Sequence, residues 1–208
     1  MTSALSDRDY LSGQLIIAMP NMGDPRFERS VVLMCSHGDD HAMGVVINKT
    51  IKDARLGELI KQVGDKAAAD TADDARKALN DPVFYGGPVR EDRGLVIHTL
   101  DYRCSETLIV NDEIGVTGTT EILAEIAAGS ENAPSQFLLA LGHAGWSGGQ
   151  LEEEIAMNAW AHGAADLDIV FAGAQQDCWR RSLERLGVTG AMLSPEWAAA
   201  RPSDSPLN

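Results

Sequence analysis

Residues 137–149 read Phe-Leu-Leu-Ala-Leu-Gly-His-Ala-Gly-Trp-Ser-Gly-Gly, and they carry the strongest structural signals in the chain. The unbroken apolar run 137–141 is typical of a strand buried on both faces. The glycines after it predict a turn from which Trp146 is able to reach solvent. Ser147 stands three residues before Gln150, which is the spacing of a helix capping box. The stretch therefore predicts a buried strand, a glycine-rich turn and the start of a helix.

Outward from this stretch, apolar periodicity and turn residues predict the remaining elements. The helix that begins near Ser147 is expected to end at Gly163. Strands are expected at 14–19, 30–35, 43–47, 83–85, 95–98, 108–110, 114–116 and 168–172. Further helices are expected at 56–63, 73–79, 121–128, 177–186 and 196–200. The early strands form a meander and the later elements alternate, which is an α+β pattern.

The size and composition of the chain fit a single globular domain. Its 208 residues include 44% hydrophobic ones, close to the ordinary globular value. We expect an N-terminal extension at 1–12, one domain at 13–200 and a disordered tail at 201–208. No apolar run approaches the about 20 residues of a membrane-spanning helix. Residues 1–12 also lack the features of a secretion signal, so the sequence predicts a soluble protein.

Charge and cysteine usage narrow the partners and the compartment. The net charge of −14 predicts repulsion from nucleic-acid phosphates and anionic lipids, so neither direct nucleic-acid binding nor membrane association is expected. Cys35, Cys104 and Cys178 form no Cys-x-x-Cys pair, which argues against a structural zinc site and a dithiol redox motif. No metal or cofactor is expected. Widely separated cysteines, odd in number, favour the reducing cytoplasm.

Several ordered strings run through the chain from about Leu11 to Gly187. They are Leu15-Ile16-Ile17-Ala18-Met19-Pro20, Asp24-Pro25-x-Phe27, Ser30-Val31-Val32, Cys35-x-His37, Ala42-Met43-Gly44-Val45-Val46-Ile47-Asn48-Lys49, Gly86-Gly87-Pro88, Arg93-Gly94-x-x-x-His98-Thr99, Ala140-Leu141-Gly142-x-Ala144-x-Trp146, Gly149-Gln150-Leu151-Glu152-x-Glu154-Ile155-x-x-Asn158-Ala159-Trp160 and Ala165-Asp166-Leu167-x-Ile169-x-Phe171. In order and length these strings resemble the YqgE/AlgH family of bacterial proteins. The chain departs from the pattern at His143, where similar proteins commonly have a tyrosine.

The resemblance implies a fold and says little about activity. It implies an α+β domain whose strongly bent, partly barrel-like mixed sheet is surrounded by helices. It also implies a cytoplasmic protein from a largely uncharacterised family, some of whose members are named as transcriptional regulators. No catalytic residue or cofactor comes with it. A charge of −14 fits an indirect effect on transcription better than contact with DNA.

Cys35 and His37 are the first candidates for chemistry. Two residues apart on a strand, their side chains are expected on the same face, where a thiolate–imidazole pair is conceivable. The alternative is a core cysteine beside a hydrogen-bonded histidine, since free cysteine is among the most buried residue types. His41 would complete a spacing that a metal could use, although Asp39 and Asp40 fit a solvated turn better.

Residues near the expected strand ends are candidates for ligand binding. Asn48 either hydrogen-bonds the local backbone or contacts a ligand. Gly86 and Gly87 predict a tight turn or a close approach of two backbones. Arg93 fits a surface ion pair or an anion site, and His98 follows on the same run. The spacing matches neither a phosphate-binding loop nor a dinucleotide fingerprint.

Gly142, Gly145 and Trp146 mark the junction between the buried strand and the next helix. Backbone donors converge at such junctions and bind anions. Glutamates at 152–154 would repel an anion there, and close packing of helix on strand is the alternative. Ser147 lies in Gly145-Trp146-Ser147-Gly148-Gly149, whose spacing differs from the usual context of a nucleophile elbow by one residue, and this argues against a hydrolase site there.

The leading hypothesis is a non-catalytic, cytoplasmic regulatory protein that binds a small molecule or a protein partner in a groove lined by strand ends. The alternative is a thiol-dependent or hydrolytic enzyme that uses Cys35 and His37. The candidate ligand-binding residues are Asn48, Gly86, Gly87, Arg93, His98, Gly142, Gly145 and Trp146.

Overall fold

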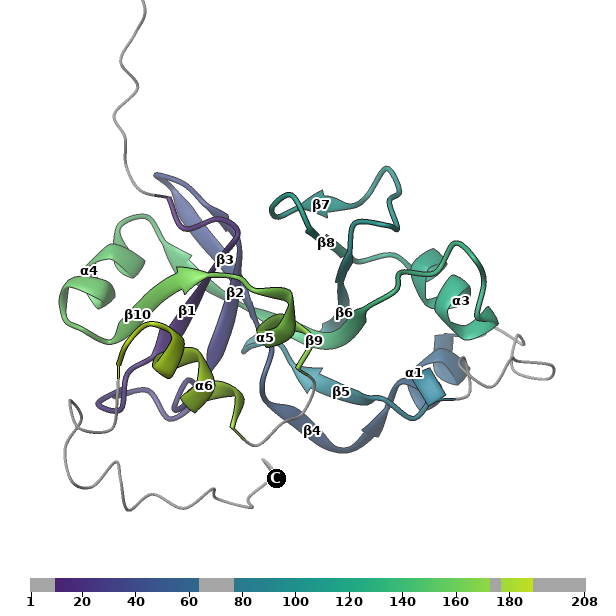
Figure 1. Ribbon diagram of the computed structural model, residues 1–208, viewed down its shortest axis with the longest axis horizontal. Coiled ribbons are helices and arrows are strands. Elements are labelled where there is room, and N and C mark those ends of the chain that lie inside the picture. Colours follow the sequence, from purple (N-terminus) through teal and green to yellow (C-terminus); the bar gives the residue numbers. More distant parts are fainter. Residues whose placement is uncertain (1–9, 64–76, 173–176, 189–208) are drawn as a thin grey trace, which may run out of the picture.

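The computed structural model describes residues 10–63, 77–172 and 177–188, and a ten-stranded sheet with flanking helices makes up this part of the chain (Figure 1). The strands are β1 (Gln14–Ala18), β2 (Val31–His37), β3 (His41–Val46), β4 (Thr50–Arg55), β5 (Pro82–Tyr85), β6 (Val89–Thr99), β7 (Leu108–Ile109), β8 (Ile114–Thr117), β9 (Phe137–Ser147) and β10 (Trp160–Ala164). The helices are α1 (Leu56–Val63), α3 (Thr120–Ala128), α4 (Gln150–Ala156), α5 (Leu167–Val170) and α6 (Cys178–Arg185). The predicted α+β class is confirmed.

Strand β9 lies in the middle of the sheet and joins its two halves. The strand order is β10-β1-β2-β3-β9-β6-β8-β7, with β5 paired to β9 and β4 to β5. The pair β5–β9 is parallel, whereas the other pairs are antiparallel, so the sheet is mixed. In Figure 1 the strands curl into a half-barrel, with β1–β3 and β6–β8 on either side of β9. The predicted bent, partly barrel-like sheet is confirmed.

Strand β9 bends at Gly142, where its partner strands change. Residues before the bend pair with β5 and β6, whereas residues 144–147 pair with β3. Gly142 has a φ of +75°, and a Cβ atom there would lie 2.4 Å from the carbonyl oxygen of Gly87. Only glycine fits so close a backbone contact. The turn predicted after residue 141 is therefore wrong, because the strand continues through the bend to Ser147.

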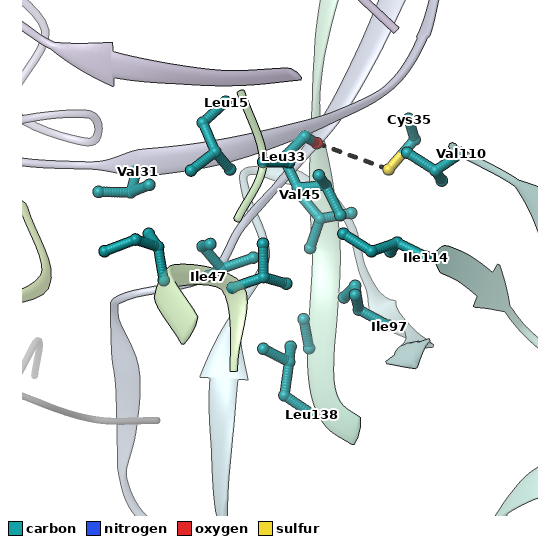
Figure 2. Close-up of a cluster of buried hydrophobic side chains, with 14 of the residues drawn as sticks. Leu15, Val31, Leu33, Cys35, Val45, Ile47, Ile97, Val110, Ile114 and Leu138 are labelled. Atoms are coloured by element: carbon teal, nitrogen blue, oxygen red, sulfur yellow. Dashed lines mark hydrogen bonds between the residues drawn. The ribbon is translucent and has the colours of Figure 1, made fainter. Parts of the chain in front are cut away.

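Buried apolar side chains divide between the two faces of the sheet. Along β2, Val31 and Leu33 pack in the largest cluster, whereas Val32 and Met34 pack in a second one. This alternation is the period of two that a strand imposes. Figure 2 shows side chains from distant parts of the sequence, including Leu15 and Ile114, meeting in the largest cluster. The core therefore depends on the curl of the sheet.

Each group of helices covers a different cluster. Helices α5 and α6 contribute Ile169 and Leu183 to the largest cluster, and α4 contributes Leu151 to the second. Helices α1 and α3 bury Leu56 and Ile122 in a third cluster. The helices expected at 56–63, 121–128 and 177–186 are confirmed as α1, α3 and α6.

The helix predicted at 147–163 is correct only over 150–156, because Ser147 is the last residue of β9 and Gly149 is the N-cap. Helix α4 ends at Ala156, and Trp160–Ala164 forms β10, which pairs with the whole of β1. Asn158 has a φ of +57°, a left-handed conformation that asparagine tolerates and a helix does not. Pairing with β1 satisfies the backbone of β10 and buries the Trp160 side chain. The apolar pattern of the sequence does not reveal this stabilisation, because it comes from residues far away in the chain.

Two other elements differ from expectation. Residues Leu167–Val170 form helix α5 instead of the strand predicted at 168–172, because a short apolar run fits a buried helix as well as a strand. Strand β4 was not predicted, since most of its side chains are half-buried or exposed and no apolar run marks it.

Some predictions fall on residues that the structure does not describe. They are the helix at 196–200, the tail at 201–208, most of the helix at 73–79 and residues 1–9 of the N-terminal extension. Within the described ranges, every helix is too short or too polar to cross a bilayer.

Candidate functional site

Five of the eight predicted binding residues lie close together where β3 and β5 end and β6 begins, beside the bend of β9. We call this the strand-end surface and define it as residues 21–29, 48–49, 85–93 and 142–143, which include Asn48, Gly86, Gly87, Arg93 and Gly142. Backbone hydrogen bonds hold it together. The Gly86 N–H donates to the Leu141 carbonyl at 2.7 Å, and the Tyr85 N–H donates to the Lys49 carbonyl at 2.8 Å. Three strand ends and a loop thus form one platform.

Gly86 and Gly87 lie where two backbones cross. A Cβ atom on Gly86 would lie 2.2 Å from the Gly142 carbonyl oxygen, and one on Gly87 would lie 2.3 Å from the His143 carbonyl carbon. No side chain fits at these distances. The close backbone approach predicted for this glycine pair is confirmed, and it places β5, β6 and β9 in contact.

Strand β6 carries a large bulge at its start. Val89 lies opposite His143 and Gly94 opposite Leu141, so residues 90–93 face Gly142 alone. Arg90 has a φ of +53°, which is unusual for a residue with a side chain. Residues 89–93 are exposed as a result. Bulges re-aim side chains and are common beside functional sites.

The arginines of the bulge lie near the His143 imidazole. Burial lowers the pKa of His143, and the charges of Arg93 and Arg90 lower it further. Arg90 contacts Asp92, with 3.4 Å between its Nε and the Asp92 Oδ1. Among the residues described, no ion pair involves Arg93, so the surface ion pair considered for it is not found. The Arg93 side chain is exposed.

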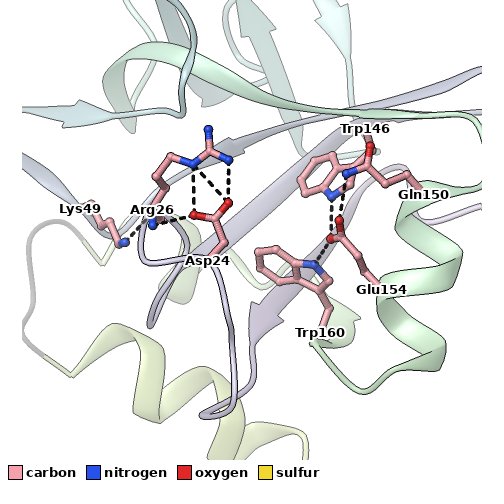
Figure 3. A network of polar contacts seen from close by, with 7 residues as sticks. All are labelled: Asp24, Arg26, Lys49, Trp146, Gln150, Glu154 and Trp160. Atoms are coloured by element: carbon pink, nitrogen blue, oxygen red, sulfur yellow. Dashed lines mark hydrogen bonds and ion pairs between the residues drawn. The ribbon is translucent and has the colours of Figure 1, made fainter.

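The loop before β2 adds a second charged group. The Arg26 side chain forms a fork with the Asp24 carboxylate, at 2.7 Å from Nη2 to Oδ2 and 3.0 Å from Nε to Oδ1 (Figure 3). The hydrogen bond from Arg26 lowers the pKa of Asp24. Lys49 donates from Nζ to the Arg26 carbonyl at 2.7 Å, and burial lowers its pKa.

Tyr85 connects the loop with the bulge. Its side chain is half-buried, and its pKa is raised first by burial and then by the Glu91 carboxylate. The charges of Arg26 and Asp24 also act on it, in opposite directions. The phenol is therefore a neutral hydroxyl at physiological pH, placed between charges of both signs. Such a group donates or accepts a hydrogen bond as a ligand requires.

Asn48 holds the loop of the strand-end surface in place through hydrogen bonds to its backbone. Its Oδ1 accepts from the Val31 N–H at 2.8 Å, and its Nδ2 donates to the Arg29 carbonyl at 2.8 Å. Both polar atoms of the side chain therefore bind backbone on either side of Ser30. Arg29, the residue before it, has a φ of +53°. Asn48 positions the loop. Its side chain binds backbone, as one alternative predicted, but this backbone is 17 and 19 residues away and is not local.

Trp146 is buried and lies in what we call the indole–carboxylate anchor, formed by Trp146, Trp160, Gln150 and Glu154 (Figure 3). Glu154 Oε2 accepts from the Nε1 of Trp146 at 3.0 Å and from that of Trp160 at 2.7 Å. Its Oε1 accepts from Gln150 Nε2 at 2.9 Å. The predicted approach of Trp146 to solvent is wrong, because the indole closes α4 onto β9 and β10.

Phe27 links the anchor to the strand-end surface. Its ring packs 6.2 Å from the Trp146 ring and 5.7 Å from the Trp160 ring, measured between centroids. The loop of residues 21–29 is thereby held against β9 and β10. Nothing in the local sequence pattern pairs Phe27 with Trp146 or Trp160.

The two remaining predicted binding residues are Gly145, which has no polar side chain, and His98, which lies away from the strand-end surface. Gly145 is an exposed strand position beside the Val89 side chain. His98 is fully buried between β6 and β8, where its Nδ1 lies 2.9 Å from the Thr99 carbonyl oxygen and its Nε2 2.9 Å from the Thr117 hydroxyl. The tertiary structure therefore separates His98 from Arg93, although they are five positions apart on one strand.

Cys35 and His37 do not form a pair. A β-bulge lies between Met34 and Ser36, and it reverses the alternation of side chains along β2. Cys35 consequently points into the largest core cluster, whereas His37 points to the other face, toward α4. The prediction that these two side chains share a face is wrong.

The Cys35 thiol is also unreactive by environment. It is buried, it contacts the Leu33 carbonyl oxygen at 3.5 Å (Figure 2), and burial raises its pKa to about 12. A thiol that stays protonated at neutral pH is a poor nucleophile. The environment of Cys35 therefore weighs against the enzyme hypothesis that uses it.

His37 ties the start of the described chain to α4. The Leu11 N–H donates to His37 Nδ1 at 3.0 Å, so Nε2 carries the proton of the neutral ring and donates to Glu152 at 3.0 Å. The metal site considered for Cys35, His37 and His41 is not found. Across residues 10–63, 77–172 and 177–188, no group of three or more His, Cys, Asp or Glu side chains could hold a metal ion, and His41 is exposed whereas Cys35 is buried.

Comparison with known proteins places this fold in one family. Residues 15–191 match the family model described as AlgH-like. A UPF0301 protein of Methylobacterium sp. (strain 4-46) is 42% identical over 186 residues, covering 89% of this chain and 88% of the relative. A UPF0301 protein of Ruegeria pomeroyi is 43% identical over 185 residues, covering 88% and 96%.

Two solved structures have the same fold. The solution structure of the AlgH protein from Pseudomonas aeruginosa has a TM-score of 0.70 and 32% identity, covering 99% of this chain and 100% of that one. The crystal structure of a Corynebacterium diphtheriae protein has a TM-score of 0.66 and 21% identity, covering 88% and 90%, and supports the fold alone. Sequence and structure thus agree that this chain belongs to the AlgH-like family.

Proposed function

We propose that this protein is a non-catalytic binding protein with a regulatory role, and that the strand-end surface takes its ligand or partner. One observation carries the proposal. Five ionisable groups with shifted pKa values, Asp24, Arg26, Lys49, Tyr85 and His143, converge on this platform. Shifted pKa values concentrate at functional sites, because binding places charges in partly desolvated positions.

The geometry of the platform supports binding through charge and hydrogen bonds. The backbone crossing at Gly86 and Gly142 and the Asn48 side chain hold the surface in one shape. A rigid platform lowers the entropic cost of binding. Arg93, Tyr85 and His143 are exposed or half-buried and keep hydrogen-bonding capacity for a ligand. The buried, protonated Cys35 weighs against the competing thiol enzyme.

The bulk charge indicates where a regulatory effect acts. With a net charge of −14, the protein repels nucleic-acid phosphates. Any influence on transcription therefore passes through a small molecule or a protein partner and not through DNA contact. The cytoplasm is the compartment that we propose, because Cys35, Cys104 and Cys178 are all unpaired thiols.

A thermal-shift screen of the full chain against a metabolite library tests the proposal. We expect at least one compound to raise the Tm of the wild type, and Arg93→Gln and Tyr85→Phe to reduce that shift without changing the Tm of the free protein. Arg103→Gln is the matched control, because Arg103 is exposed beyond the other end of β6. Equal shifts in all variants, or no stabilising compound, would contradict a binding role for this surface.

A further inference from the structure

A chain of hydrogen-bonded side chains connects a thiol with an imidazole between β6 and β8. Cys104 Sγ lies 3.4 Å from the Thr107 hydroxyl, which lies 2.8 Å from the Thr117 hydroxyl. The Thr117 hydroxyl lies 2.9 Å from Nε2 of His98. We call these four side chains the thiol–imidazole relay. They lie outside the strand-end surface.

The direction of every hydrogen bond in the relay follows from one carbonyl group. The Thr99 carbonyl oxygen can only accept, so His98 Nδ1, at 2.9 Å, carries the proton of the neutral ring. Nε2 is then bare and accepts from the Thr117 hydroxyl. Thr117 in turn accepts from Thr107, and the Thr107 oxygen accepts from the Cys104 S–H. The proton of the thiol therefore points along the relay toward a free base.

The surroundings hold the relay in this arrangement. The Cys104 N–H also donates to the Thr107 hydroxyl at 3.0 Å, which fixes the loop that carries the thiol. The Tyr102 ring packs edge-on against His98 with 5.4 Å between ring centroids. Gly115 leaves room for the imidazole, because a Cβ there would lie 3.0 Å from His98 Cε1. The imidazole is thus packed on two sides, and its full burial shields it from water.

Cys104 differs from the other two cysteines in exposure and in the direction of its pKa shift. Cys35 and Cys178 are buried, and burial raises the pKa of each thiol. Cys104 is half-buried, and its pKa is lowered because Thr107 donates a hydrogen bond to the thiolate once the thiol proton has left. Thiolate character and access together decide which cysteine reacts. Cys104 alone among the three has both.

We propose that Cys104 is a nucleophilic thiol, deprotonated by His98 through Thr107 and Thr117, and that it forms mixed disulfides with low-molecular-weight disulfides. The inference goes beyond the binding function of the strand-end surface and does not depend on it. It assigns the thiol–imidazole chemistry of this chain to Cys104 and His98, in place of Cys35 and His37.

The exchange balances without an outside oxidant other than the disulfide. The thiol proton passes to the Thr107 oxygen as the Thr107 proton passes to Thr117 and the Thr117 proton to His98 Nε2. The Cys104 thiolate attacks one sulfur of the disulfide, the S–S bond breaks, and its electron pair leaves with the other sulfur. The leaving thiolate takes a proton from the Thr107 hydroxyl, Thr107 is reprotonated by Thr117, and Thr117 by His98, so the relay returns to its starting state. One protein thiol and one small disulfide become a mixed disulfide and one small thiol.

The test is alkylation of the native full-length protein with iodoacetamide from about pH 5 to about pH 10, with labelling of each cysteine read by peptide mass spectrometry. We expect Cys104 to label with a midpoint below that of N-acetylcysteine measured in parallel, and Cys35 and Cys178 to stay unlabelled. Oxidised glutathione should form its mixed disulfide at Cys104. A Cys104 midpoint equal to that of the free thiol overturns the proposal without any variant.

Variants of Thr117 test the relay itself. Thr117 connects Thr107 with His98 and is not the hydroxyl that lies beside the Cys104 thiol, so its removal interrupts the relay without removing the Thr107 contact of the thiol. Thr117→Val keeps the shape and removes the hydroxyl, and we expect labelling of Cys104 near neutral pH to slow about three- to tenfold. Thr117→Ser restores the hydroxyl and should restore the rate. Thr120→Val, at an exposed threonine outside the relay, is the control. Equal rates in wild type and Thr117→Val would overturn the role of His98.

Discussion

The indole–carboxylate anchor and the strand-end surface are in contact through Phe27 and use polar groups in opposite ways. In the anchor, one carboxylate accepts from two indoles and one amide, and its two tryptophans are buried. At the strand-end surface, Arg93, Tyr85 and His143 stay exposed or half-buried, and Arg93 enters no ion pair within the described ranges. The first region therefore stabilises the fold, and the second is the region that we propose binds a ligand.

The difference teaches how to separate structural from functional polarity. A buried polar group with all its partners in the same chain is costly to disturb, because removing one partner leaves the others unsatisfied. A half-exposed charge is cheap to remove, because water replaces its partner. Substitutions in the two regions should therefore differ in their effect on stability, and the following experiments measure that difference.

The largest effect is expected at the backbone crossing beneath the strand-end surface. Gly142→Ala places a Cβ 2.4 Å from the Gly87 carbonyl oxygen at a φ of +75°, so we expect a loss of about 3–5 kcal/mol in unfolding free energy. Gly145→Ala, three residues along β9, meets only Val89 at 4.0 Å and should cost under about 1 kcal/mol. Urea denaturation checks both, and similar losses would show that the crossing is not tight.

Removing the carboxylate of the anchor should come next in size. Glu154→Ala leaves two indole N–H groups without an acceptor, and we expect a loss of about 2–4 kcal/mol. Glu153→Ala is the matched control, since Glu153 is the exposed neighbour on α4. Denaturation followed by tryptophan fluorescence measures the difference. Equal stability of the two variants would make the anchor dispensable.

Acidification should weaken the fold through His98. Burial lowers its pKa below the ordinary 6.5, so between the folded value and 6.5 the unfolded chain binds the proton and the folded chain does not. This contribution to stability is complete above 6.5 and falls as the pH drops toward the folded pKa, by at most about 1.4 kcal/mol per pH unit. NMR titration of the His98 ring checks the direction, and a midpoint above 6.5 would reverse it.

The smallest effect on stability is expected at Arg93. Arg93→Gln removes an exposed charge that forms no ion pair in the described part of the chain, so the unfolding free energy should change by less than about 0.5 kcal/mol. The same variant should lose most of the ligand-induced thermal shift. A large loss of stability would place Arg93 with the structural residues of the anchor and not with the binding surface.

Parts of the site were predictable because they depend on local backbone chemistry. Gly86 and Gly87 predicted a close approach of two backbones, and the structure shows it against Gly142 and His143. For Asn48 only the bonding to backbone was predictable, because its partners Val31 and Arg29 lie 17 and 19 residues away and not in the local turn that was expected. The glycine prediction needs only the stereochemistry of one residue type.

Other parts of the site were not predictable, because they depend on a β-bulge in β2 and on the pairing of strands that are distant in sequence. The extra residue of the β2 bulge turns Cys35 into the core and His37 to the other face. The thiol–imidazole relay joins residues 98, 104, 107 and 117, which share no motif spacing and meet only because β6 and β8 pair. Spacing rules assume regular alternation, and a bulge or a cross-strand contact breaks that assumption.

The sequence by itself determined the α+β class, the central buried strand at 137–141, most of the helices and the acidic charge, because these follow from composition and from apolar periods along a short stretch. The tertiary structure decided that β9 continues past Gly142, that Trp146 is buried, and that Trp160–Ala164 is a strand. Those outcomes depend on hydrogen bonds and packing with residues far away in the chain, which no local pattern encodes.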